Sequence, residues 1–137
     1  MLRKNAKIEL LKRVPLFAHC SRRELAQIAL LSTEVSLPAG RKLMAEGDPG
    51  REFFVLVDGQ VEVRRKGRRV RQLSDGDFLG EIALIADIPR TATVTALTSV
   101  TTLLVTARDF RTLMREVPSL QPKLIYSLAM RLPPEFQ

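Results

Sequence analysis

The residues best suited to chemistry are a glutamate and an arginine at the two ends of a mostly apolar segment. Glu81 directly follows Gly80, Arg90 directly follows a proline, and residues 82–89 separate the two side chains. A glycine permits an unusual backbone angle or the close approach of another group. An arginine guanidinium is always charged and can bind a phosphate through two parallel hydrogen bonds. The pattern therefore indicates an anion site beside a carboxylate.

The local structure expected around these charges agrees with that chemistry. Residues 81–86 favour a short helix that Pro89 ends, and the first N–H groups of a helix have no partners within it and suit an anion. Glu81 can accept hydrogen bonds from sugar hydroxyls, and the small side chains at 91–94 allow a ligand to lie close to the strand. In the alternative interpretation, Glu81 and Arg90 pair with each other or with neighbours across the fold. The sequence has no G-x-x-x-x-G-K-[ST] loop.

Helices are predicted at the start of the chain. Residues 5–13 and 22–32 carry apolar side chains at helical spacing, and Ser21 with Glu24 forms a capping-box pattern. From Thr33 the period changes to alternation, with turns rich in Gly, Asp and Pro. Residues 33–106 therefore predict about seven or eight short strands, of which residues 52–58 are expected to be buried on both faces.

Helices are predicted again over residues 107–132. Thr106 begins the first of them as a cap, Ser119 is expected to cap the last one, and Pro122 then lies in its first turn, where a missing N–H costs little. The last helix must stop near residue 133, where two prolines follow each other. The whole pattern predicts one α+β domain over residues 1–137, with an antiparallel barrel or jelly roll between helices.

Composition restricts the class of protein. The chain has 137 residues, 45% of them hydrophobic, and a net charge of +7. It shows no apolar run long enough to span a membrane and no signal peptide, and its lone Cys20 favours a reducing compartment, so we expect a cytoplasmic domain. The basic run 64–71 straddles Gly67 and predicts a solvated hairpin tip, with contact to nucleic acid or another anionic partner as the alternative.

Catalysis and specific DNA binding are not supported. His19 and Cys20 are the only residues of their types, and they are adjacent, without the spaced ligands of a metal site or the third group of a triad. After Arg115 only 22 residues follow, too few for a helix-turn-helix.

Residues 76–96, GDFLGEIALIADIPRTATVTA, closely resemble the phosphate-binding cassette of cyclic-nucleotide-binding domains. The resemblance includes the Gly-Glu pair, Ala83, the Pro-Arg pair at the family spacing and the Ala-Thr-Val tail. It extends over nearly the whole chain, through PLFAHCSRREL and PAGRKLMAEGDPGREFFVLVDGQVEV. The resemblance implies an eight-stranded antiparallel jelly-roll barrel over residues 33–106, with the cassette at 78–94, N-terminal helices at 1–32 and C-terminal helices at 107–132.

The resemblance also implies roles for individual residues. Arg90 would pair with the cyclic phosphate and Glu81 with the ribose 2′-hydroxyl, while backbone N–H groups of Ala83 and Thr91 would contact the phosphate. The full set of implied ligand-binding residues is Gly80, Glu81, Ile82, Ala83, Arg90, Thr91, Val63, Val70 and Arg71. The last helix would cover the base, with Leu124, Tyr126 and Leu128 as the lid residues. In the alternative interpretation, Leu124, Leu128 and Leu132, spaced by four, are the core stripe of that helix.

The implied function is that of a sensor. A cyclic purine nucleotide, with cAMP favoured over cGMP, would shift the flanking helices and so act on an effector domain in cis or in trans. Thr91 is the position where the choice between adenine and guanine is open. No metal is expected, and the early end of the last helix predicts a monomer or a weak dimer.

Overall fold

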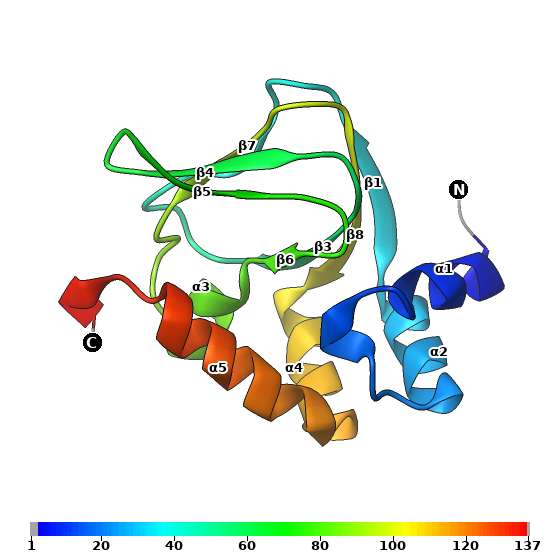
Figure 1. The fold of residues 1–137 in the computed structure, drawn as a ribbon. Coiled ribbons are helices and arrows are strands. Elements are labelled where there is room, and N and C mark those ends of the chain that lie inside the picture. Colours follow the sequence, from blue (N-terminus) through cyan, green and yellow to red (C-terminus); the bar gives the residue numbers. More distant parts are fainter. Residues whose placement is uncertain (1–2, 137) are drawn as a thin grey trace.

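The fold is described from a computed structural model, over residues 3–136. Figure 1 shows strands in the upper half of the molecule and helices below them. The helices are α1 (Lys4–Leu11), α2 (Arg22–Leu31), α3 (Glu81–Ala86), α4 (Ala107–Glu116) and α5 (Gln121–Arg131), with 3₁₀ turns η1 (Pro15–Phe17), η2 (Pro118–Leu120) and η3 (Pro134–Phe136). The strands are β1 (Thr33–Leu37), β2 (Lys42–Met44), β3 (Glu52–Asp58), β4 (Val61–Arg65), β5 (Arg68–Leu73), β6 (Phe78–Leu79), β7 (Thr93–Ala96) and β8 (Val100–Thr106).

The strands form two antiparallel sheets of four, ordered β1-β8-β3-β6 and β2-β7-β4-β5. In the first sheet β3 pairs with β8 from Glu52↔Thr106 to Asp58↔Thr101, and in the second β4 pairs with β7 from Val61↔Ala96 to Arg64↔Thr93. Eight antiparallel strands between helices are thus confirmed. Within residues 3–136, the strand pairings stay inside the two sheets and do not close them into one barrel.

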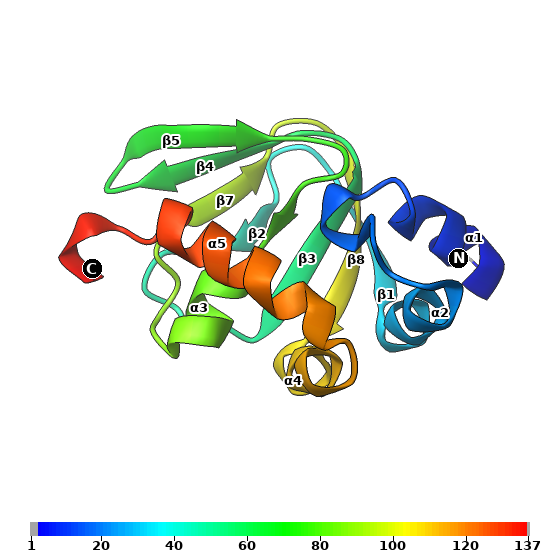
Figure 2. The same ribbon diagram turned by 60° about the horizontal axis from the view of Figure 1, so that its bottom comes forward.

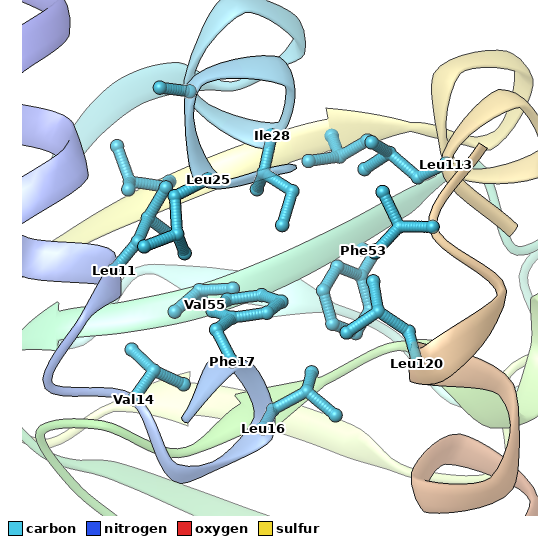
Figure 3. Close-up of a cluster of buried hydrophobic side chains, with 14 of the residues drawn as sticks. Leu11, Val14, Leu16, Phe17, Leu25, Ile28, Phe53, Val55, Leu113 and Leu120 are labelled. Carbon is cyan, nitrogen blue, oxygen red and sulfur yellow. The ribbon is translucent and has the colours of Figure 1, made fainter. Parts of the chain in front are cut away.

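The two faces of β3 separate two hydrophobic cores. Phe53 and Val55 face the helices, whereas Phe54 and Leu56 face the second sheet, and all four are buried. Burial on both faces of this strand is therefore confirmed. Figure 3 shows the helical core, where Phe53 and Val55 lie among side chains from α1, η1, α2 and the C-terminal helices. The Phe53 ring lies 5.1 Å from the Phe110 ring, which ties α4 to the sheet.

The helix caps agree with the sequence at two of three positions. Ser21 accepts from the Glu24 N–H at 3.1 Å while the Glu24 carboxylate accepts from the Ser21 N–H at 2.8 Å, and Thr106 caps α4. Ser119 does not cap α5, so that prediction is wrong. Pro118 begins a 3₁₀ turn that buries Leu120 and continues directly into α5, which leaves Ser119 inside the turn. Pro122 does lie in the first turn of α5.

The basic run 64–71 is the β4–β5 hairpin. Its tip is a two-residue turn with positive φ at Lys66 (52°) and Gly67 (78°), the pattern of a type I′ turn. Arg64 and Arg69 lie opposite each other, and both pair with the Glu62 carboxylate, at 2.8 and 3.0 Å. Burial at the hairpin is low, and the expectation of a solvated tip is confirmed.

Candidate functional site

Gly80 joins β6 to α3 at a point where only glycine fits. Its φ is +96°, in the left-handed region, and a Cβ there would lie 2.6 Å from the Glu52 carbonyl oxygen and 3.0 Å from the Arg90 guanidinium. The missing side chain lets the start of α3 press against β3. This places Glu81, the first residue of α3, inside the protein.

Arg90 is held in the interior by backbone carbonyls. Only 5% of the residue is exposed, and its guanidinium donates to the Glu52 carbonyl at 2.7 Å and to the Gly80 carbonyl at 3.1 Å. Burial lowers the pKa of Arg90 from its ordinary value, while the charges of Glu52 and Glu81 oppose that shift. No carboxylate among residues 3–136 forms an ion pair with this guanidinium. Because a buried charge is costly without a counter-charge, the arrangement favours an anion beside Arg90.

Glu81 pairs with the last helix rather than with Arg90. Its carboxylate is 1% exposed and accepts from Arg131 Nη1 at 2.9 and 3.2 Å and from Ser127 Oγ at 3.1 Å. Burial raises the pKa of Glu81 above its ordinary value, and the Arg131 charge and the Ser127 hydrogen bond oppose that shift. Arg131 also donates to the Phe78 carbonyl at 2.8 Å and lies over the Phe78 ring at 4.8 Å. The direct pairing of Glu81 with Arg90 does not occur, whereas the other part of that alternative, pairing with a neighbour across the fold, does occur for Glu81.

A pocket joins these two charged residues to the second sheet. It encloses about 630 Å³ of empty space, including part that is open to solvent. All nine implied ligand-binding residues line it: Val63, Val70, Arg71, Gly80, Glu81, Ile82, Ala83, Arg90 and Thr91. The structure therefore brings β4, β5, α3 and the segment after α3 to one cavity.

The lid residues implied by the resemblance do not line this pocket. Leu124 is 1% exposed and belongs to the helical core, as expected from the alternative interpretation of a core stripe. Tyr126 is exposed on the outer side of α5. Leu128 is half-buried and does not line the pocket. Leu124 packs in the helical core while Ser127 and Arg131 contact Glu81 of α3, so a lid at these three positions stays a prediction.

Sequence reasoning missed Arg131 and Pro133, which line the pocket in place of that lid. Ser127 and Arg131 are four residues apart, so they share one face of α5, and this face meets Glu81. A polar pair at that spacing in the mostly apolar stretch 124–131 was the available signal. Arg65 and Met44 also line the pocket and were not expected.

Arg71 is the other cation of the pocket without an acidic partner. It is half-buried on β5, and within residues 3–136 it forms no ion pair. Its pKa is lowered by burial and then by the neighbouring Arg131 charge, while Glu81 opposes the shift. The pocket thus presents two cations, Arg71 and Arg90, with no carboxylate paired to either.

The described residues include no arrangement that supports a metal site or a reactive thiol. Residues 3–136 hold no group of three His, Cys, Asp or Glu side chains that could bind a metal ion. His19 is exposed, and burial raises the pKa of the Cys20 thiol, which disfavours the reactive thiolate. None of the helices over this range is long and apolar enough to cross a membrane.

The domain thus combines a pair of four-stranded antiparallel sheets with a short helix that follows a left-handed glycine and lies beside a buried arginine. The sequence model described as cyclic nucleotide-binding domain matches residues 34–117. The chain belongs to the cyclic nucleotide-binding domain family.

Known proteins of several kinds are similar to it. A cAMP-dependent protein kinase regulatory subunit of Emericella nidulans is 34% identical over 119 residues, covering 85% of this chain and 29% of that protein. A candidate potassium channel of Rhodopseudomonas palustris is 34% identical over 116 residues, covering 82% and 28%. The catabolite activator protein of Thermus thermophilus, a solved structure, superposes with a TM-score of 0.78 at 26% identity, covering 86% and 58%. The chain spans less than a third of the length of these two curated relatives.

Proposed function

We propose that this domain binds a cyclic purine nucleotide in the pocket between α3 and the β4–β5 hairpin, with cAMP as the ligand, and that binding moves the flanking helices. The observation that carries the proposal is Arg90, a buried guanidinium held by two carbonyls and without a carboxylate partner among residues 3–136. A single phosphate supplies the missing charge. Backbone N–H groups of Ala83 and Thr91 are proposed to complete its binding site.

The sugar is proposed to bind at Glu81. A ribose 2′-hydroxyl can donate to this carboxylate, whose oxygens already accept from Ser127 and Arg131 of α5. The ligand and the last helix would therefore share one carboxylate. A ligand shifts an equilibrium only through different affinities for two states. The shared Glu81 supplies such a difference, because an altered position of its carboxylate changes the hydrogen bonds that hold α5.

The base is proposed to lie toward Val63, Val70 and Arg71. The expectation of cAMP comes from the resemblance, and one observation favours cGMP as a second candidate. Arg71 lies in the pocket and forms no ion pair with any of the described residues 3–136. An arginine binds the O6 and N7 acceptors of guanine with two hydrogen bonds, whereas adenine presents a donor in place of O6. The Thr91 hydroxyl, also in the lining, can accept from the guanine amino group.

The test is thermal unfolding in the presence of cAMP, cGMP or linear 5′-AMP. A ligand at a free concentration 100 times its Kd stabilises the native state by about 2.7 kcal/mol. This corresponds to a rise in Tm of roughly 10 °C for a domain of this size. A rise with a cyclic form and none with 5′-AMP is expected. The larger rise identifies the base. If no nucleotide raises the Tm, the proposal of cyclic nucleotide binding is wrong, and binding of an anionic partner by the basic surface becomes the better hypothesis.

The wider role is proposed from the relatives. Because they extend well beyond the matched region, we propose that the domain regulates an effector in cis or in trans, in the cytoplasm, as a monomer or a weak dimer. Measuring the mass in solution with and without cyclic nucleotide tests the oligomeric state.

A further inference from the structure

Gly50 differs from the other glycines within residues 3–136. The chain has seven glycines, and six of them have a positive φ, which favours glycine over any residue with a side chain. Gly50, in the connection between β2 and β3, is the seventh, and its φ lies outside that region. The backbone angle therefore does not explain why residue 50 lacks a side chain.

The space beside Gly50 is filled by Ala83 of α3, a helix that Figure 2 shows close to α5 and to the start of β3. A Cβ at residue 50 would lie 2.4 Å from the Ala83 Cβ, whereas carbon atoms in contact are about 3.5–4.0 Å apart. The Ala83 Cβ is bonded directly to the backbone and has no rotamer that avoids the clash. A side chain at residue 50 would therefore push α3 away by about 1 Å. The next nearest atoms, Arg90 Nη1 at 3.5 Å and the Ala83 carbonyl carbon at 3.6 Å, lie at ordinary contact distance.

The chain on both sides of Gly50 holds Arg90. Before it, the Gly47 N–H donates to the Arg90 carbonyl at 2.9 Å, and the Arg90 N–H donates to the Asp48 carbonyl at 2.8 Å. After it, the Glu52 carbonyl accepts from the Arg90 guanidinium at 2.7 Å. This segment thus fixes both the backbone and the side chain of Arg90, while Gly50 in its middle touches α3.

We propose that Gly50 is a positioning residue for the phosphate site, because its missing side chain sets the distance between the Ala83 N–H and the Arg90 guanidinium. The proposal rests on the proposed function, since it assumes that these two groups bind one phosphate. A binding site must hold its groups to within about 0.5 Å of the productive geometry, and a Cβ at residue 50 forces a displacement of roughly twice that. Gly50→Ala therefore alters the spacing of the two groups and leaves their chemistry unchanged.

The experiment is calorimetric titration of wild type and variants with cAMP and with cGMP. Gly50→Ala should weaken binding about ten- to hundredfold, the scale of one hydrogen bond to a charged group. Ala83→Gly removes the obstructing Cβ and keeps the backbone N–H. The double variant Gly50→Ala/Ala83→Gly should therefore recover most of the lost affinity, because the two substitutions share one contact and are not additive.

Ala86→Gly is the matched control for that rescue. It makes the same exchange at the end of α3, at a residue that does not line the pocket. The helix propensity lost is of the same kind, but no space opens beside Gly50. Gly50→Ala/Ala86→Gly should thus bind no better than Gly50→Ala alone.

Thermal unfolding without nucleotide reports the contact independently. Where the backbone accommodates it, alanine in place of glycine stabilises a protein by restricting the unfolded chain. We expect the opposite here, a lower Tm for Gly50→Ala and a partial recovery in Gly50→Ala/Ala83→Gly. A wild-type Kd in Gly50→Ala, or affinity that Ala83→Gly does not restore, would overturn the proposal. If Gly50→Ala does not fold, the double variant decides in the same way, by folding and binding or by failing to. If wild type binds neither cAMP nor cGMP, the proposed function itself is wrong.

Discussion

Replacing Arg131 by alanine tests the link between the pocket and the last helix. In the native protein the Glu81 carboxylate is 1% exposed, and Arg131, whose side chain is 16% exposed, is its cationic partner. The substitution leaves Glu81 buried with only the Ser127 hydroxyl and solvent that enters the space left by Arg131. The carboxylate then either carries an uncompensated charge or takes up a proton.

The expected loss follows from this burial. Removing one partner of a fully buried ion pair costs about 3–5 kcal/mol, and exposed pairs contribute at most about 1 kcal/mol. Because Arg131 is largely but not completely buried, we expect Arg131→Ala to lower the free energy of unfolding by about 2–3 kcal/mol at pH 7. In the variant Glu81→Gln the buried charge is already absent, so adding Arg131→Ala should cost less than half as much.

The loss should depend on pH in one direction. Burial raises the pKa of Glu81 in the folded state, and removing the Arg131 charge raises it further. A carboxyl group with a raised folded pKa binds its proton more tightly in the native state. The stabilisation of the folded state by this proton is fully present below the pKa of the unfolded state, about 4.5. It is lost as the pH rises through the pKa of the folded state. Arg131→Ala should thus be closest to wild type near pH 4.5 and furthest from it at pH 7.

Urea unfolding of wild type, both single variants and the double variant at pH 4.5 and pH 7 measures these quantities. A coupling energy between Glu81 and Arg131 below about 0.5 kcal/mol, with no difference between the two pH values, would refute the idea that a buried charge pair connects α3 to α5.

Three further outcomes are expected. Arg90→Ala should weaken cyclic nucleotide binding by about 1.5–3 kcal/mol in calorimetry, the scale of hydrogen bonds to a charged group, and an unchanged Kd would exclude the phosphate role. Glu81→Ala should weaken binding of the native nucleotide but hardly that of its 2′-deoxy analogue, and equal losses would count against the ribose role. Gly80→Ala should lower the free energy of unfolding by at least about 1 kcal/mol more than Gly40→Ala. Both glycines have positive φ, but only at Gly80 would the Cβ meet a carbonyl, at 2.6 Å, so equal costs would mean that the contact is unimportant.

Local signals in the sequence predicted much of this protein. The change from helical spacing to alternation at Thr33, the capping box at Ser21 and the turn at Gly67 each act within a few residues, and each has the predicted structure. The Gly-Glu and Pro-Arg pairs are local too. Their spacing is part of a short loop and helix, so the position of Glu81 and Arg90 in one pocket could be expected from the sequence.

The wrong prediction of the Ser119 cap concerns how a segment packs against the rest of the fold. Ser119 has the chemistry of a cap, but burial of Leu120 and the 3₁₀ turn at Pro118 decided the start of α5. Leu124 packs in the helical core as the core-stripe alternative expects, and Tyr126 and Leu128 do not line the pocket, so a lid at these positions stays a prediction.

The sequence by itself determined the elements, the anion-binding segment and the family, because these depend on the order and spacing of nearby residues. The tertiary structure decided which side chains surround that segment. Arg131 is 50 residues from Glu81, and Glu135 is 70 residues from Arg65, so both pairs exist only because α5 packs across α3 and the segment after α5 reaches the hairpin. Such pairs depend on the rotation of one packed helix, which the spacing of residues along the chain does not specify.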